Sequence, residues 1–369
     1  MAATKKLGFA VVGLGKIAED AVLPAFRHTK KARLVAVVSR DGAKAKRVAR
    51  KFGAKSFYQS DDFSSCLLNP GVDAIYIATP PGNHLKVTHA AAAGGKHIVC
   101  EKPLAATVTQ SAEMVAVCKR AGITLMTAYR KYFEPSSLAL KKLIASGKLG
   151  RLDAIHSSFS ENYRPGVSQP WLVDLELSGG GPLMDLGIYC INSGRWLAGE
   201  DPIEASAESW RRDDTTFRHV EEGISFRAKF PSGLLLQGNS TFSAELSSFI
   251  YLQGTEGWAM LTPAFTFHEP RLLSWSVKGK ITTKKFPVLD EFALEIDAFA
   301  DAVLRGRTPE PDGEQGHRDI IIASAIYESA RLGRPVLIDY GALERYPQVR
   351  NHDSEKSISL GRRVKPRVL

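Results

Sequence analysis

Short apolar runs and amphipathic stretches alternate regularly over the first third of the chain. Residues 7–12 are almost wholly apolar, which is typical of a strand buried on both faces of a parallel sheet. Further apolar runs predict strands at residues 33–38, 72–78, 96–100 and 123–128. Because helical stretches lie between these runs, residues 1–128 are predicted to form a doubly wound parallel sheet of the Rossmann type.

The pattern changes after residue 128, where strands follow one another directly. Turn signals such as Pro231-Ser232-Gly233 separate six of them, which are expected at residues 152–160, 225–230, 234–237, 248–253, 258–262 and 272–277. Helices are expected at residues 137–146, 291–305 and 316–332. Residues 129–345 are therefore predicted to form an α+β domain for substrate binding and oligomerisation, with a large, mostly antiparallel open sheet. Residues 346–369 are expected to be a basic tail, and the overall fold class is α/β.

Composition and charge exclude several classes of protein. The net charge of +10 comes from scattered Lys and Arg residues, without the basic stripe and interleaved aromatic residues of a nucleic-acid surface, and it suits an anionic small ligand. The four cysteines are far apart and form no Cys/His pattern, so they are expected to be reduced, and no metal site is predicted. No secretory signal or membrane span is evident, which predicts a cytoplasmic location, or a periplasmic one if a leader has been removed.

A glycine-rich turn follows the first predicted strand. Gly13-Leu14-Gly15-Lys16-Ile17-Ala18 fits the pattern G-x-G-x-x-A between a strand and a helix. In such a turn the first glycine allows a tight bend, the second lets the backbone approach a pyrophosphate, and the small residue permits close packing of helix on strand. The sequence therefore predicts a dinucleotide site at this turn.

The end of the second strand indicates which dinucleotide binds. An NAD-selective site usually places a carboxylate here to hold the ribose 2′-hydroxyl. This chain offers Ser39 and Arg40 instead, with Lys44 one turn later, which favours a 2′-phosphate and hence NADP. The alternative is that Asp41 binds the ribose and Arg40 points into solvent, in which case the cofactor is NAD.

Two further strand ends carry polar residues. Thr79-Pro80-Pro81-Gly82-Asn83-His84 follows the strand at residues 72–78, and Glu101-Lys102-Pro103 follows the strand at residues 96–100. Carboxyl ends of parallel strands lie at one edge of a sheet, where ligands bind in open α/β folds. Glu101 and Lys102 are therefore candidates for an active site, although a solvated ion pair before a helix remains the alternative.

A second group of candidate residues lies in the second half of the chain. Ser178-Gly179-Gly180-Gly181 precedes a stretch that can form a helix, on which Asp185 and Tyr189 are four residues apart and share a face. An acid and a phenol on one face can bind a hydroxylated substrate and exchange protons with it. The alternative is a helix that Asp185 merely stabilises at its N-terminus, with Tyr189 half-buried.

The glycine turn, the Glu101-Lys102-Pro103 segment and the Asp185/Tyr189 stretch together resemble the Gfo/Idh/MocA oxidoreductase family, over about residues 7–339. Tyrosine rather than histidine four residues after the aspartate, together with the segment Tyr129-Arg130-Lys131-Tyr132, resembles the branch of the glucose–fructose oxidoreductases. The resemblance implies that Lys102, helped by Asp185, binds the reacting carbinol and that Tyr189 exchanges its proton. It implies a cofactor wall made of Thr79, Pro80, Asn83, His84, Glu101, Lys102 and Arg130.

The loop at residues 163–171, with Tyr163 and Trp171, is the expected substrate rim. Leu172 stands where this branch would have an arginine, so the identity of the sugar does not follow from the resemblance. A lysine beside a cationic nicotinamide, and a tyrosine beside that lysine, are both expected to have lowered pKa values.

These observations predict an NADP-dependent oxidoreductase that moves hydride between nicotinamide C4 and a carbinol carbon of a sugar or related polyol. A non-catalytic NADP-sensing regulator and a nicotinamide-dependent glycosidase are the alternatives on the same scaffold. A homodimer or homotetramer formed through the second sheet is expected, without nucleic-acid or membrane partners.

Overall fold

The computed structural model describes residues 6–166 and 168–341. The predicted basic tail at residues 346–369 lies outside the described residues. Within the described part of the chain, no helix is both long and apolar enough to cross a bilayer.

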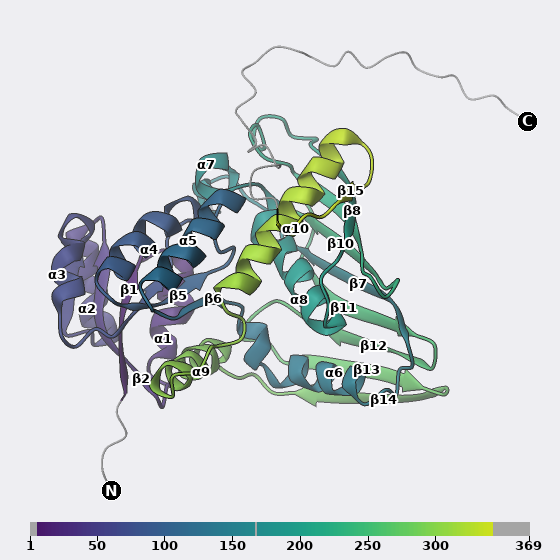
Figure 1. The fold of residues 1–369 in the computed structure, drawn as a ribbon, viewed down its shortest axis with the longest axis horizontal. Helices are drawn as coiled ribbons and strands as arrows, with labels where there is room; N and C mark the ends of the chain where they lie inside the picture. The colour runs from purple at the N-terminus through teal and green to yellow at the C-terminus, as the bar shows by residue number, and fades with distance from the viewer. Residues whose placement is uncertain (1–5, 167, 342–369) are drawn as a thin grey trace, which may run out of the picture.

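The N-terminal part forms a parallel sheet, as predicted, and the sheet has six strands (Figure 1). Its strands stand in the order β3-β2-β1-β4-β5-β6, and they are β1 (Leu7–Val12), β2 (Ala32–Ser39), β3 (Ser56–Gln59), β4 (Ala74–Ile77), β5 (His97–Glu101) and β6 (Leu125–Ala128). Every residue of β1 and β4 is buried, which is why their runs are continuously apolar. Strand β3 was not predicted, because its alternate residues are exposed and it is only four residues long.

Helices flank this sheet on both faces. They are α2 (Gly42–Phe52), α3 (Phe63–Leu68), α4 (His84–Ala93) and α5 (Val108–Arg120). The helix after the glycine turn is less regular than expected: a π-helical segment at Ala18–Val22 precedes the short α1 (Leu23–Ala25). Pro24, which has no N–H to donate to the preceding turn, lies where the hydrogen-bonding pattern changes.

The second half forms a nine-stranded open sheet, in the order β14-β13-β12-β11-β7-β10-β9-β8-β15. Its pairs are antiparallel except for the parallel pair of β7 and β10. The strands are β7 (Leu152–Ser160), β8 (Glu204–Trp210), β9 (Gly223–Lys229), β10 (Leu235–Thr241), β11 (Ser247–Gly254), β12 (Gly257–Thr262), β13 (Arg271–Val277), β14 (Lys280–Phe286) and β15 (Val336–Leu337). A mostly antiparallel sheet was predicted and is confirmed.

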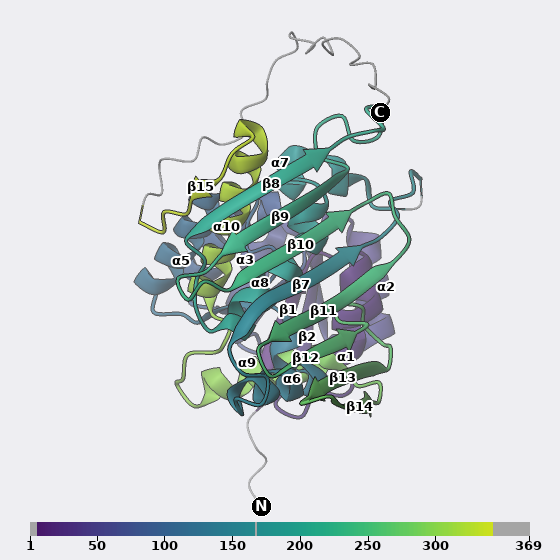
Figure 2. The ribbon, with the colours of Figure 1, turned by 90° about the vertical axis from the view of Figure 1, so that its right-hand side faces the viewer.

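One face of the second sheet is covered by helices and the other is open (Figure 2). The covering helices include α6 (Pro135–Ala145), α8 (Ile188–Ala198) and α10 (Gly313–Leu332). Strand β9 shows the resulting alternation, since Ile224, Phe226 and Ala228 are buried while Ser225 and Arg227 are exposed. Buried aliphatic and aromatic side chains of this face form the largest apolar cluster in the described residues.

Helix α9 (Glu291–Leu304) follows the second sheet in sequence but packs against the first one (Figure 1). Its buried Phe292, Ile296 and Phe299 join the apolar cluster of β1, where the rings of Phe9 and Phe299 are 5.8 Å apart. The chain therefore crosses back to the Rossmann sheet after completing most of the second one. The division into residues 1–128 and 129–345 stays a prediction.

Candidate functional site

A cavity of about 1880 Å³ runs along the carboxyl edge of the parallel sheet and reaches the second sheet. It brings together nearly all of the residues that the sequence singles out. Its lining includes Gly13, Leu14, Gly15, Lys16, Ile17, Ser39, Arg40, Lys44, Thr79, Pro80, Asn83, Glu101, Lys102, Arg130, Tyr163, Trp171, Asp185 and Tyr189.

The glycine turn has the geometry that a pyrophosphate site needs. Gly13 has a φ of +93°, and a Cβ at this position would lie 2.6 Å from the carbonyl oxygen of Ala78, so only glycine fits. At Gly15 the nearest neighbour of such a Cβ would be the Gln169 side chain, 3.7 Å away, which leaves the backbone open towards the cavity. The hydroxyl of Thr79 is buried here without a hydrogen-bond partner in the described chain. These features fit a bound dinucleotide.

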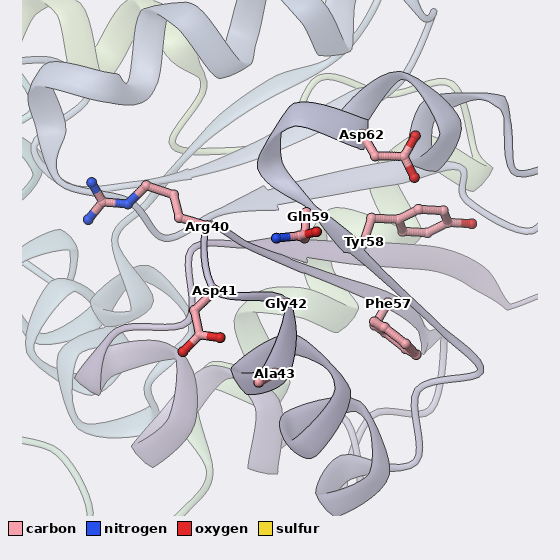
Figure 3. Close-up of a pocket in the computed structure, with 8 residues that line it drawn as sticks. All are labelled: Arg40, Asp41, Gly42, Ala43, Phe57, Tyr58, Gln59 and Asp62. Carbon is pink, nitrogen blue, oxygen red and sulfur yellow. The ribbon is translucent and has the colours of Figure 1, made fainter.

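The end of β2 separates the roles of Arg40 and Asp41. Asp41 caps α2, since its Oδ1 accepts a hydrogen bond from the Lys44 backbone N–H at 3.0 Å. Arg40 is exposed on the cavity wall, and its side chain extends away from Phe57, Tyr58 and Asp62 of a small adjoining pocket (Figure 3). Among the described residues, its guanidinium has no ion-pair partner. This arrangement leaves a cation, rather than a carboxylate, available to a ligand at the end of β2.

Lys44 and His84 were predicted to bind the cofactor directly, and the structure places their side chains differently. The Lys44 ammonium is paired with Glu19 at 2.8 Å, so it is not a free cation. His84 is fully buried behind the cavity wall and does not line it. Its ring nitrogens lie 2.8 Å from the Thr79 carbonyl oxygen and 3.0 Å from that of Leu104, and burial lowers its pKa. His84 therefore ties the end of β4 to the segment after β5.

Lys102 and Asp185 meet across the cavity, 83 residues apart in the sequence. The Lys102 ammonium donates to Asp185 Oδ1 at 2.9 Å and to the Asp185 carbonyl oxygen at 2.7 Å. Asp185 lies in a π-helical segment (Leu183–Gly187) that continues into α8, and Tyr189 follows in the first turn of α8. The Lys102 nitrogen lies 5.0 Å from the centre of the Tyr189 ring. The three residues named as the reacting group therefore form one cluster.

The pKa of Tyr189 is shifted opposite to the prediction, whereas the prediction for Lys102 concerned the lysine beside a bound oxidised nicotinamide. Burial alone would lower the pKa of Lys102, but the attraction of Asp185, Tyr189 and Glu101 outweighs burial and raises it. Burial raises the pKa of Tyr189, and the positive charges of Arg130 and Lys102 offset this effect only in part. Without a bound cofactor, the cluster thus holds a charged ammonium beside a neutral phenol. The prediction for Tyr189 neglected the burial of its ring.

Arg130 lines the cavity as predicted, but it also holds the tyrosine. Its guanidinium donates to the hydroxyl of Tyr189 and to the carbonyl oxygen of Phe265. The Nε of Arg130 lies 3.2 Å from Glu291 of α9, and both side chains are almost completely buried. Glu291 was not predicted, because a charged residue near a helix N-terminus resembles an ordinary solvated position.

Glu221 is a second residue that the sequence did not reveal. Its buried carboxylate accepts hydrogen bonds from the backbone N–H of Gly181 at 2.9 Å and of Leu183 at 3.0 Å, and from the Tyr327 hydroxyl at 2.9 Å. Gly180 and Gly181 have no room for a Cβ, which would lie 2.0 Å from Tyr327 and 2.3 Å from Glu221. The glycines thus serve close packing around Glu221, which fixes the segment that carries Asp185.

Aromatic and polar side chains enclose the part of the cavity next to Tyr189. The Tyr189 ring contacts Phe159 and Phe265, with centroids 5.8 and 5.7 Å away. Tyr163 and Trp171 line the rim as predicted, and the Trp171 indole donates to Gln169 at 2.8 Å. Further rim residues, which were not predicted, are Glu161, Asn162, Phe242, Glu245 and Phe267.

The fold and the site together define an oxidoreductase with a Rossmann dinucleotide domain and a second, sheet-based domain over its cavity. Residues 7–129 match the family described as an oxidoreductase family with an NAD-binding Rossmann fold, GFO_IDH_MocA, and residues 137–260 match the GFO/IDH/MocA C-terminal domain. The chain belongs to the Gfo/Idh/MocA oxidoreductase family, which confirms the resemblance seen in the sequence.

Several relatives are similar over two thirds of the chain or more. The D-xylose 1-dehydrogenase [NADP(+)] of Haloarcula marismortui is 32% identical over 334 residues, which are 90% of this chain and 93% of the relative. A trans-1,2-dihydrobenzene-1,2-diol dehydrogenase of Oryctolagus cuniculus is 33% identical over 256 residues, 68% of this chain and 74% of the relative. The crystal structure of aldose-aldose oxidoreductase from Caulobacter crescentus, complexed with glycerol, superposes with a TM-score of 0.85 at 33% identity, and the match covers 90% of this chain and all of that one.

Proposed function

We propose that this protein is an NADP-dependent oxidoreductase that transfers hydride, reversibly, between the nicotinamide and a carbinol carbon of an aldose or related polyol. The observation that carries the proposal is the cluster of Lys102, Asp185 and Tyr189 in the same cavity as the glycine turn. The sugar dehydrogenases among the relatives support it.

Residues at the carboxyl edge of the parallel sheet would hold the cofactor, whose nicotinamide supplies the hydride acceptor. The turn at Gly13 and Gly15 would take the pyrophosphate, and Arg40 the 2′-phosphate. Two observations support NADP over NAD: the Asp41 carboxylate already caps α2, and the Arg40 guanidinium is exposed on the cavity wall. The xylose dehydrogenase relative is named for NADP(+).

The chain's own residues supply binding and proton transfer. The Lys102 ammonium, which Asp185 orients, would donate a hydrogen bond to the reacting oxygen of the substrate. In carbonyl reduction the neutral phenol of Tyr189 would give its proton to that oxygen, and in carbinol oxidation the phenolate would accept the proton. Phe159 and Phe265 enclose the Tyr189 ring and keep water away from it.

The rim favours a neutral, hydroxylated substrate over an anionic one. Glu161 and Glu245 line the cavity and can accept hydrogen bonds from sugar hydroxyls, while Asn162 can both donate and accept. Carboxylates at this rim would repel a sugar phosphate. Aromatic residues such as Trp171 offer surfaces for the apolar face of a sugar ring.

The proposal is tested by incubating purified protein with NADP+ and a panel of aldoses, polyols and sugar phosphates. The near-ultraviolet absorbance of reduced nicotinamide should rise with at least one neutral aldose and not with its phosphate. The Lys102→Ala variant should bind NADP+ but reduce it at least about 100-fold more slowly. The exposed Lys280 gives the matched control variant Lys280→Ala, which should behave as wild type. Wild-type turnover in Lys102→Ala would contradict the assignment of the site.

The same assay separates two modes of turnover. An enzyme that keeps its cofactor would oxidise one aldose and reduce a second without added NADP+, as the name aldose-aldose oxidoreductase of the Caulobacter crescentus relative describes. An enzyme that releases its cofactor would produce free NADPH in proportion to the aldose consumed. Chromatographic analysis of both sugars and of the nucleotide distinguishes the two outcomes.

We further propose that the open face of the second sheet joins two copies of the chain. On β11 the buried Ile250 and Leu252 alternate with Phe249 and Tyr251, so these two aromatic side chains lie on the open face. There the ring centroids of Tyr251 and Trp258 are 6.0 Å apart. A half-buried aromatic patch on an uncovered sheet is typical of a homo-oligomer surface. Sedimentation of wild type and of a Tyr251→Glu variant tests this.

The four free, buried cysteines support the proposed cytoplasmic location.

A further inference from the structure

The buried hydroxyl of Tyr76 lies between two carboxyl groups, one from the cavity wall and one from helix α9. The hydroxyl of Tyr76, on β4, lies 2.8 Å from Glu101 Oε1 and 3.2 Å from Glu295 Oε1. Tyr76 and Glu295 are fully buried, and Glu101 is 7% exposed where it lines the cavity beside Lys102. We call Glu101, Tyr76 and Glu295 the carboxyl triad.

The two contacts of the Tyr76 hydroxyl can both be hydrogen bonds only if one of the two carboxyl groups carries a proton. A phenol has a single O–H, so it can donate to only one of the two carboxyl groups. The second contact is a hydrogen bond only if the other carboxyl group is protonated and donates to the phenol oxygen. Burial raises the pKa of Glu295 well above its ordinary value, and it also raises the pKa of Glu101. We assign the extra proton to Glu295, which is fully buried and whose Oε2 has no hydrogen-bond partner among the described residues. Tyr76 then donates to an ionised Glu101, which lines the cavity beside Lys102.

The charges that face the triad come from every element packed around it. Lys102 and Arg130 attract the Glu101 carboxylate, and Arg130 also attracts Glu295. Glu291, one turn earlier on α9, repels Glu295, but its own charge is engaged by Arg130, Lys131 and Arg271, with Glu134 nearby. The phenol of Tyr189 completes the surroundings. Glu101 is thus the carboxylate of the triad that is placed between these fixed charges and the cavity.

We propose that the carboxyl triad takes up a proton, on Glu101, when the nicotinamide bound in the cavity changes from its cationic oxidised form to its neutral reduced form. The proposal rests on the proposed function. Oxidation of a carbinol breaks its C–H and O–H bonds: the hydride passes to the nicotinamide, which loses its positive charge, and the proton leaves through Tyr189. Protonation of one carboxylate then keeps the net charge of the buried site constant, with Glu101 as a carboxylic acid. The reverse reaction releases this proton.

The physical reason is the energy of a buried charge. A cationic ring in the cavity offsets the cost of keeping Glu101 ionised in a poorly solvated place. When the ring becomes neutral, this compensation is lost. Glu295 cannot take up a proton in response, because it already carries the extra proton. Glu101 is the member that can still accept one. The triad consequently links the oxidation state of the bound cofactor to pH.

Calorimetric titration of the purified protein, freed of nucleotide, tests the proposal. NADP+ and NADPH are each titrated between about pH 6 and pH 9, in two buffers with different ionisation enthalpies, which gives affinity and protons taken up. NADPH should bind with uptake of up to one proton more than NADP+. As the pH rises, the ratio of Kd for NADP+ to Kd for NADPH should fall by up to about tenfold per pH unit, over the pH range in which Glu101 changes its protonation state. The 2′-phosphate is the same in both nucleotides, so its titration cancels.

Two variants assign the proton. Glu101→Gln imitates the protonated acid, so the difference in proton uptake should vanish and NADP+ should bind several-fold more weakly relative to NADPH. Glu295→Gln imitates the carboxyl group that is already protonated, so the difference should persist. Equal uptake for both nucleotides in the wild type, or a difference that survives in Glu101→Gln, would overturn the proposal. A difference lost in Glu295→Gln would overturn the assignment of the shared proton to Glu295. Binding of neither nucleotide would instead refute the proposed function.

Discussion

The guanidinium of Arg130 donates a hydrogen bond to the hydroxyl of Tyr189, and the Arg130 Nε lies 3.2 Å from Glu291. This relationship links α8, which carries the tyrosine, to the segment after β6 and to α9. Glu291 is held in turn by Arg271 at 2.7 Å and by Lys131 at 3.3 Å. The position of the Tyr189 phenol is thus set by a buried charge network rather than by its own helix alone.

Replacing Arg130 should impair catalysis more than substrate binding. Arg130→Lys keeps the positive charge but loses the planar fork that reaches both Tyr189 and Phe265. We expect kcat to fall by about 100-fold, because small displacements of a reacting group are costly, with KM changed much less. Steady-state kinetics with a matched Arg227→Lys variant, on the exposed side of β9, provide the check. A wild-type kcat in Arg130→Lys would show that the hydrogen bond to Tyr189 does not matter.

The pH dependence should differ between the two directions of the reaction. Carbinol oxidation needs the deprotonated Tyr189, whose pKa burial raises above the ordinary value of about 10. The oxidation rate should therefore increase with pH from about pH 6 to beyond pH 10, while the reduction rate stays level over the same range. A deuterated substrate shows whether hydride transfer limits the measured rate. An oxidation rate that is independent of pH while the isotope effect is fully expressed would exclude Tyr189 as the proton acceptor.

Arg40 should decide the choice between the two nicotinamide dinucleotides. In Arg40→Ala, affinity for NADP+ should fall by at least about tenfold, because a charge-assisted hydrogen bond to phosphate is lost, while NAD+ affinity should change little. Lys44→Ala makes the comparison informative, since Lys44 already pairs with Glu19 and should matter less. Equal losses for both nucleotides in Arg40→Ala would argue against a phosphate at this position. Fluorescence titration of each variant measures both affinities.

Glu221 should support both stability and catalysis. In Glu221→Leu, the N–H groups of Gly181 and Leu183 lose their buried acceptor, which should cost about 1–3 kcal/mol of unfolding free energy. The segment of Asp185 should shift as well, lowering kcat in the protein that remains folded. Denaturant unfolding and kinetics on the same preparation measure both effects. The exposed Glu208, on β8, gives Glu208→Leu as the control; equal stability of the two variants would contradict this role.

Much of the fold could be predicted because many of its strands have a recognisable local sequence pattern. Buried strands such as β1 and β4 are continuous apolar runs, and the glycine turn has a fixed spacing. Strands β8 and β14 were not predicted because polar residues interrupt the apolar pattern of β8 and because every residue of β14 except Phe286 is exposed. The return of α9 to the first sheet is a long-range packing choice, and no local pattern of residues specifies it.

The residues that line the cavity were easier to predict than those that support them. Gly13, Lys102, Asp185 and Tyr189 occur in recognisable motifs, and the structure gathers them in one cavity. Glu221, Glu291 and Glu295 look like solvated charges in the sequence, since their partners lie elsewhere in the chain. The pKa direction of Tyr189 was predicted wrongly for the same reason, because it depends on burial and on the charges of Arg130, Lys102 and Glu101 together.

The central claim is that Tyr189 handles the proton during hydride transfer to NADP+ in this cavity. The most direct measurement is a single-turnover experiment, in which wild type and Tyr189→Phe are saturated with NADP+ and mixed rapidly with an aldose substrate. Tyr189→Phe should bind NADP+ with the wild-type affinity and form reduced nicotinamide at least about 100-fold more slowly. Formation of reduced nicotinamide at the wild-type rate in Tyr189→Phe would contradict the account.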